Sequence, residues 1–393
     1  MEHCTVIQLF DSVEELVRAH VADFIEAIIE DEVTQVLERS RYSRGGQGYR
    51  NGHRERTLTT TFGEVAINVP RARLVTEQGA GEFRSAVIPK GRRLTPNAEA
   101  LIVSAYLCGV STRKSQVALA QALGSGVSKS TVSRCLQNLR PQWDAWQTRD
   151  LAGEGIERLI LDGIVLSARV GDRRERMSIL VALGVRADGM KVALAFKPMG
   201  AESKAAWQEL LEDLAGRGVK SPQVVITDGS KGLEAALAEV WPFALVQRCT
   251  VHKERNLLAK APERLHGDLK DDYAKMMYAE TAEDALALRR AFLAKWRRLC
   301  PGVAKSLEEA GDRLFTFLRF PPGQWKSLRT TNAIERLQEE FRRRVKVQGM
   351  QPSAESACLL FWALLASGAV KMRKVDGFQT LRAAPKEQPL PAA

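Results

Sequence analysis

Apolar and polar positions follow two different periods in the first hundred residues. Between residues 13 and 25 apolar side chains recur every three or four positions, which predicts an amphipathic helix over residues 11–39. From 65 to 69 they alternate with polar ones, and an Asn-Gly turn signal stands at 51–52, so short strands are expected between 39 and 93. Residues 1–95 are therefore predicted to form an N-terminal helical and basic β region.

Residues 96–140 carry the pattern of a helix-turn-helix. A first helix ends near Gly109, a second runs from a cap at Ser111 to Leu123, and a third follows a glycine turn and a cap at Ser128. In the third helix the apolar positions would face the core, and the outward candidates for DNA contact are Lys129, Ser130, Ser133 and Arg134. Basic and hydroxyl residues early in such a helix are typical of a recognition helix, although many helical hairpins share the pattern.

The character of the chain changes after a predicted linker at 141–155. The elements expected beyond it are strands at 159–161, 177–185, 191–196, 224–227 and 243–247, with helices at 203–215 and 232–240. This order has an antiparallel start and parallel additions, which is typical of a mixed α/β sheet. Helical periodicity returns at 254–318, and a last helix begins near Asn332. The final residues, 383–393, are expected to form a disordered tail.

The charge of the chain suggests a polyanionic partner. Lys and Arg number 58 against 47 Asp and Glu, which leaves a net charge of +11, and most of the excess falls between residues 39 and 93. Such an excess favours contact with nucleic acid. We name Arg50, Arg54 and Arg56 as candidate contacts to the DNA backbone. A solvated basic face on a small β element is an equally good interpretation of the same residues.

Several classes of protein are excluded by composition. The chain has 393 residues, 45% of them hydrophobic, which suits two or three globular domains. The longest strongly apolar stretch, Leu359–Val370, is too short to cross a membrane, and no secretion signal is expected at the start. Six cysteines occur without Cys-x-x-Cys pairs, which is typical of reduced thiols. The sequence therefore predicts a cytoplasmic protein with no membrane partner.

Three acidic residues stand where chemistry could occur. Asp162 follows an apolar strand, Asp228 follows the next parallel strand, and Glu335 lies in the first turn of the last predicted helix. Each has a simpler interpretation, which is a hairpin turn for Asp162, a helix N-cap for Asp228 and a capping box for Glu335. Strand ends of one sheet can converge at an edge that binds ligands, and clustered carboxylates need cations. Two Mg²⁺ or Mn²⁺ ions are the expected cofactors.

The chain as a whole resembles the bacterial insertion-sequence transposases of the Mutator type. The matching segments are GYRNGHRERTLTTTFGEVAINVPRAR (48–73), GVSTRKSQVALAQALGSGVSKSTVSR (109–134), LILDG (159–163), VVITDGSKGL (224–233), QRCTVHKERNL (247–257) and TTNAIERLQEEFRRR (330–344). The resemblance implies an RNase H-like catalytic core with a helical insertion, preceded by a helical DNA-binding region. It divides the core into 156–260, an insertion at 261–328 and a C-terminal part at 329–382, and it assigns a catalytic and metal-binding triad to Asp162, Asp228 and Glu335.

The resemblance also implies an activity and its partners. Such a protein binds the terminal inverted repeats of an insertion sequence, cleaves them to give 3′-hydroxyl ends and joins these to target DNA, as a homo-oligomer on paired ends at the nucleoid. No nucleotide cofactor is expected, because the chain has no GxxxxGK[ST] loop. Two rival interpretations stay open, a non-catalytic helix-turn-helix regulator and a structure-specific nuclease that has the same core but no joining step.

Two further groups of residues lie close to the triad in the matching segments. Cys249 and His252 form a Cys-x-x-His motif that is expected to shape the site or contact DNA. Zinc is not expected there because a structural zinc site needs four ligands. A buried thiol and a helix-capping imidazole are the simpler interpretation of that motif. The predicted phosphate contacts on the last helix are Arg342, Arg343 and Arg344, and a solvated helix face would also explain some of them.

Overall fold

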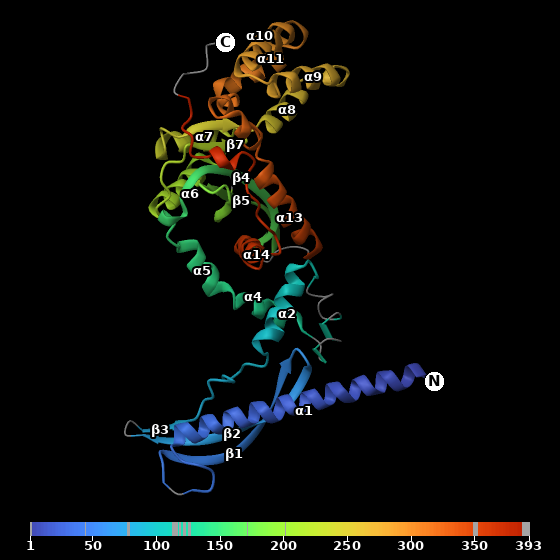
Figure 1. The fold of residues 1–393 in the computed structure, drawn as a ribbon, viewed down its shortest axis with the longest axis vertical. Coiled ribbons are helices and arrows are strands. Elements are labelled where there is room, and N and C mark those ends of the chain that lie inside the picture. The colour runs from blue at the N-terminus through green and yellow to red at the C-terminus, as the bar shows by residue number, and fades with distance from the viewer. Residues whose placement is uncertain are drawn as a thin grey trace. The chain divides into compact units, whose positions relative to one another are not determined.

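The computed structural model divides into two compact units, Met1–Asn138 and Leu139–Ala393 (Figure 1). It describes residues 2–386 apart from 44, 77–78, 112–116, 118, 121–122, 125–126, 171, 201 and 349–352. Among these described residues no helix has both the length and the apolarity to cross a membrane.

The first unit combines one long helix with a small antiparallel sheet. The sheet has the order β1 (Gly48–Thr60), β2 (Gly63–Thr76) and β3 (Gly79–Glu82), and helix α1 (Glu2–Leu37) packs on β1 and β2. The strands β1 and β2 are longer than the short strands expected. The reason is that the Asn-Gly pair at 51–52 does not turn the chain. It lies inside β1, where the register with β2 shifts between Arg50 and His53.

Two further helices of this unit are described. Helix α2 (Pro96–Leu107) follows its cap Thr95, and helix α4 (Lys129–Gln137) follows Ser128, whose hydroxyl accepts a hydrogen bond from the amide of Thr131 at 3.1 Å. The predicted cap at Ser128 is therefore confirmed. Val132 and Cys135 are buried, and the four outward candidates of α4 are exposed. The helix predicted between Ser111 and Leu123 falls largely outside the described residues.

The second unit is built on a mixed five-stranded sheet. Its strands are β4 (Ile156–Val170), β5 (Arg173–Arg186), β6 (Lys191–Met199), β7 (Val224–Thr227) and β8 (Leu245–Arg248). The order across the sheet is β6-β5-β4-β7-β8. The pairs β6·β5 and β5·β4 are antiparallel, and the pairs β4·β7 and β7·β8 are parallel. The mixed α/β sheet predicted from the sequence is confirmed.

Helices cover both faces of this sheet (Figure 1). On one face, α6 (Lys204–Gly216) and α7 (Lys231–Val240) pack against Leu159 and Leu161 of β4. Because side chains alternate along a strand, Ile160 and Asp162 point to the opposite face. That face carries α13 (Asn332–Gln348) and α14 (Ala354–Ala366), whose Phe341 and Phe361 stack with ring centroids 3.9 Å apart.

The segment 141–155, predicted as a linker, is folded into the second unit. It contains helix α5 (Arg140–Thr148) and a short 3₁₀ helix (Ala152–Glu154). Trp143 is buried, stacks on Trp146 and lies 6.1 Å from the ring of Trp362 on α14. The aromatic side chains of this segment explain the difference, because they have an apolar surface to bury.

A group of helices separates β8 from α13. They are α8 (Thr250–Leu258), α9 (His266–Met277), α10 (Ala282–Leu299), α11 (Pro301–Ala310) and α12 (Trp325–Leu328), with 3₁₀ helices at Glu263–Leu265, Gly311–Leu314, Thr316–Arg319 and Pro322–Gln324. A last 3₁₀ helix covers Phe378–Thr380. In the predicted tail, Lys386 exchanges two hydrogen bonds with Arg319, and residues 387–393 lie outside the described part.

Candidate catalytic site

The register of the sheet aligns the two aspartates. Strands β4 and β7 pair in parallel, with Leu159 opposite Val225 and Ile160 opposite Ile226, an offset of 66 residues. The same offset separates Asp162 from Asp228. Because β7 ends at Thr227, Asp228 is the first residue beyond the strand. Continued by two residues, the register places Asp228 level with Asp162.

Asp162 does not stand at the end of its strand. Strand β4 continues to Val170, and Asp162 pairs with Val181 in the middle of the antiparallel ladder with β5. The alternative of a hairpin turn at Asp162 is therefore wrong. So is the expectation that the strand closes there, because the apolar run resumes at Ile164 and extends the ladder.

The carboxylate of Asp162 is held from two sides. Its Oδ1 accepts a hydrogen bond from the amide of Gly163 at 2.9 Å, and its Oδ2 accepts one from Nε2 of Gln338 at 3.0 Å. Burial and the charge of Asp228 raise the pKa of Asp162 to about 6, although the charge of His252 opposes the shift. The site therefore disfavours a second negative charge unless a cation compensates it.

Asp228 begins the turn between β7 and α7. Its Oδ1 accepts a hydrogen bond from the amide of Ser230 at 2.9 Å, and α7 begins one residue later with Ser230 in the N-cap position. Asp228 is thus not the N-cap that its sequence context suggested.

Sequence reasoning missed a further carboxylate, that of Glu202. It lies against the α-carbon of Gly163, so a side chain at position 163 would collide with it. Burial and the charge of Asp228 raise the pKa of Glu202. The close approach explains the glycine in the Asp-Gly pair better than a turn does. No sequence signal could have found Glu202, which belongs to no motif.

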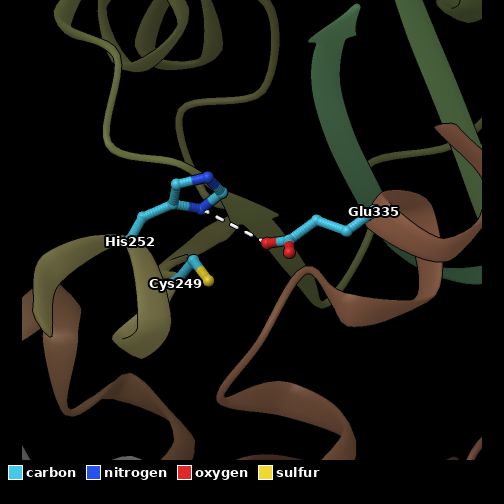
Figure 2. A group of neighbouring side chains, drawn as sticks. All are labelled: Cys249, His252 and Glu335. Carbon is cyan, nitrogen blue, oxygen red and sulfur yellow. Dashed lines mark ion pairs between the residues drawn. The ribbon is translucent and has the colours of Figure 1, made fainter. Parts of the chain in front are cut away.

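Glu335 enters the site from α13. Its Oε1 accepts a hydrogen bond from the hydroxyl of Thr331 at 2.9 Å and lies 3.6 Å from Nδ1 of His252, while Oε2 lies 3.9 Å from Arg255. Figure 2 shows Glu335 reaching toward His252 beside the sulfur of Cys249. The capping-box alternative does not account for the contacts with His252 and Arg255, because these connect Glu335 with helix α8.

Cys249 and His252 lie at the start of α8. Cys249 is completely buried, and its sulfur accepts hydrogen bonds from the amide and the hydroxyl of Thr331. Hydrogen bonding to Cys249, helped by the charges of Cys249, Glu335 and Asp162, raises the pKa of His252 to about 9. Burial opposes ionisation of the Cys249 thiol, but hydrogen bonds with His252 and Thr331 outweigh it and lower its pKa.

One group of side chains could hold a metal ion directly. The ligand atoms of Cys249, His252 and Glu335 lie within 4.8 Å of one another. His252 lies close enough to both Glu335 and Asp162 that the charges of these two acids raise its pKa. The structure thus brings the predicted triad and the Cys-x-x-His motif into one region of the second unit.

The arginines predicted to contact DNA from the first unit differ in whether their side chains already bind other residues of the protein. Arg50 donates hydrogen bonds to Glu30 and Thr34 on α1, and Arg56 donates to backbone carbonyls between residues 88 and 92, whereas Arg54 is exposed. These partners give Arg50 and Arg56 a structural role in the first unit.

The three arginines on α13 also differ. Arg342 is exposed, and its guanidinium donates to Oε1 of Gln338 at 3.4 Å. Arg343 forms an ion pair with Glu340 at 2.6 Å, and Arg344, which is largely buried, lies 4.0 Å from the same carboxylate. Arg342 is therefore the one of the three that is connected to Asp162, through Gln338.

The sequence matches the family of Mutator transposases over residues 1–373. It is 33% identical to the transposase for insertion sequence element ISRM5 of Rhizobium meliloti over 90% of this chain and 87% of that protein. It is 34% identical to the transposase for insertion sequence element IS6120 of Mycolicibacterium smegmatis over 69% of this chain and 84% of that protein. The chain therefore belongs to the Mutator family of transposases.

A solved structure also aligns with the chain. It is the simian T-cell lymphotropic virus intasome in complex with PP2A regulatory subunit B56 gamma, with 12% identity, a TM-score of 0.21 and coverage of 75% of this chain and 78% of that chain. A TM-score this low does not indicate a shared fold.

Proposed function

We propose that this chain binds the terminal inverted repeats of an insertion sequence, cleaves the ends to give 3′-hydroxyl groups and joins them to target DNA. Asp162, Asp228 and Glu335 are the catalytic residues of this proposal, on an RNase H-like core. The observation that carries it is the parallel register of β4 and β7, which aligns Asp162 with Asp228 in a member of a transposase family.

The donor set fits hard divalent cations. Asp162, Asp228 and Glu335 offer carboxylate oxygens, which suit Mg²⁺ or Mn²⁺. Burial, together with the charge of Asp228, raises the pKa of both Asp162 and Glu202, and a bound cation would compensate the negative charge of the ionised acids. When bound, two such ions activate an attacking oxygen and stabilise the leaving one. We assign Asp162 and Asp228 to hold them, with Glu335 completing the set.

The chain's own residues prepare this chemistry. Gly163 and Gln338 hold the carboxylate of Asp162, and Ser230 holds that of Asp228, so both present fixed oxygens to the site. His252 and Thr331 hold Glu335. In this proposal Cys249 and His252 shape the site and hold no zinc, because their group supplies three ligands where a structural zinc site needs four.

DNA binding is assigned to the basic stretch 39–93 and helix α4 of the first unit and to helix α13. Lys129, Ser130, Ser133 and Arg134 are exposed on α4, where they can reach base edges or phosphates. Arg54 and Arg342 are exposed, and in this proposal both contact the DNA backbone, Arg342 with the donors that its hydrogen bond to Gln338 does not use. Arg343 joins them if its pair with Glu340 opens. The protein would act on nucleoid DNA in the cytoplasm as a homo-oligomer on paired ends.

The test compares Asp162→Asn, Asp228→Asn and Glu335→Gln with Glu339→Gln, an exposed neighbour on the same helix, in cleavage and strand-transfer assays. We expect each triad variant to lose about 10²–10⁴-fold in rate, since each tenfold corresponds to about 1.4 kcal/mol of transition-state stabilisation. The control should react normally. Cleavage should need Mg²⁺ or Mn²⁺ and fail in Ca²⁺, which is larger and prefers looser geometry.

The same assays separate the rival functions. End binding should survive in the triad variants and weaken when Lys129 and Arg134 are both replaced by Ala. Cleavage without joining by the wild type would indicate a nuclease. Binding without any metal-dependent cleavage would indicate a regulator. If Glu335→Gln cleaves as well as Glu339→Gln, the third acid is misassigned.

A further inference from the structure

Gln338 occupies a position that needs a hydrogen-bond donor on one side and an acceptor on the other. It is 3% exposed. Nε2 donates to Oδ2 of Asp162 at 3.0 Å, and Oε1 accepts from the guanidinium of Arg342 at 3.4 Å. An ionised carboxylate only accepts hydrogen bonds and a guanidinium only donates them. The two neighbours therefore fix which end of the amide faces Asp162.

We propose that Gln338 is a positioning residue for Asp162: its amide, oriented by Arg342, holds one carboxylate oxygen of Asp162 and sets the spacing between the ligands on β4 and those on α13. This inference rests on the proposed function, because it takes Asp162 as a ligand of the catalytic cations. It adds a residue that the triad does not contain.

The neutral charge of Gln338 is what suits it to this position. A Lys or Arg there would compensate the charge of Asp162 and compete with a cation for it. An apolar residue would leave Oδ2 without its buried donor, which carries a large desolvation cost. The amide holds the carboxylate in one orientation and leaves its negative charge for the metal. Hydrogen-bonded partners of this kind around metal ligands tune affinity for the ion.

The hydrogen bond also joins two distant parts of the chain. Gln338 lies one helical turn after Glu335, on the same face of α13, whereas Asp162 lies 176 residues earlier on β4. Glu335 is held separately, by Thr331 and His252. Without Gln338, nothing else among the hydrogen bonds of the described residues connects the carboxylate of Asp162 with α13. The spacing of the two ligands then depends on backbone packing alone.

The experiment measures Mn²⁺ binding by electron paramagnetic resonance in the full-length protein without DNA. It compares the wild type with Gln338→Met, which keeps the length of the side chain but cannot donate, with Asp162→Asn and with the control Glu339→Gln. We expect Gln338→Met to bind Mn²⁺ about 10–100-fold more weakly, with an altered spectrum. In strand transfer its kcat should fall while its KM for DNA stays unchanged, which a loss of packing alone would not produce.

Two outcomes overturn the inference. Wild-type Mn²⁺ binding in Gln338→Met, together with loss of binding in Asp162→Asn, would refute it and leave the proposed function standing. Wild-type binding in Asp162→Asn would remove Asp162 as a ligand, and with it both proposals. If Gln338→Met has no cooperative thermal transition, Gln338→Asn replaces it. This variant is one methylene too short to span both partners, and unchanged Mn²⁺ binding in it would refute the inference.

Discussion

Replacing Asp162 by Asn should make the protein more stable relative to the wild type as the pH rises, because only the wild type has an acid that ionises at this buried position. Burial and the charge of Asp228 raise the pKa of Asp162 from 3.8 to about 6 in the folded state. The folded chain therefore binds this proton more tightly than the unfolded chain. As the pH rises from about 4 to about 6, the wild type loses stability that the Asn variant keeps.

The size of the effect follows from the shift. Each pKa unit corresponds to about 1.4 kcal/mol, so a shift of about two units gives up to about 3 kcal/mol. Other consequences of the substitution, such as two amides facing each other at Gln338, do not depend on pH. The difference in the free energy of unfolding between Asp162→Asn and the wild type should therefore grow by about 1–3 kcal/mol from pH 4 to pH 8.

Urea unfolding at both pH values, in the presence of EDTA, measures this difference. Glu339→Gln on the exposed face of α13 is the control and should show no such growth. At pH 8, Mg²⁺ should stabilise the wild type but not Asp162→Asn, because a ligand that binds the folded state stabilises it. A difference that is the same at pH 4 and pH 8 would refute the electrostatic reasoning.

Two further substitutions test the surroundings of the site. Glu234 on α7 is 8% exposed and pairs with Arg248 at 2.5 Å and with Arg313. Glu234→Gln should therefore lower the free energy of unfolding, measured in urea, by about 3 kcal/mol. The control Glu239→Gln, whose pair with Lys204 is exposed, should lower it by less than about 1 kcal/mol. Equal costs would contradict this. Gly163→Ala should displace Glu202 and slow strand transfer about tenfold, whereas Gly302→Ala, with open space around it, should not. Normal activity in Gly163→Ala would show that Glu202 has no part in the reaction.

The sequence predicts the sheet well because its signals are local. The buried strand at Val224–Thr227 has the predicted bounds, and the strands on either side of it fall where apolar runs occur. The sequence also points to Asp162 and Asp228 as residues that follow apolar runs. It cannot show that β4 continues past Asp162, because an Asp-Gly pair between apolar runs is also the strongest cue for a hairpin.

The parts that the sequence does not show depend on tertiary contacts. Glu202 approaches Gly163 from the segment after β6, a meeting that no spacing predicts. Gln338 could have been suspected from its position three residues after Glu335, but its partner Asp162 could not. Arg50 and Arg56 stood out as free cations within a basic stretch, and only the fold shows that α1 and the loop at 88–92 engage them.

Although 107 residues separate Asp228 from Glu335 in the sequence, the helical segment between β8 and α13 begins and ends at the same place in the structure. The helical segment between β8 and α13 leaves the sheet at Thr250 and returns at Arg329, and there the amide of Thr250 donates to the carbonyl of Arg329 at 2.8 Å. Close by, Cys249, one residue before Thr250, and Thr331, two residues after Arg329, are in contact through the sulfur. Because the two ends of this segment meet beside β8, the number of residues between them does not affect where α13 begins. The position of Glu335 is set by Thr331 and His252 at this closure, so the helices from α9 to α12 can vary in length without moving Glu335 away from the sheet.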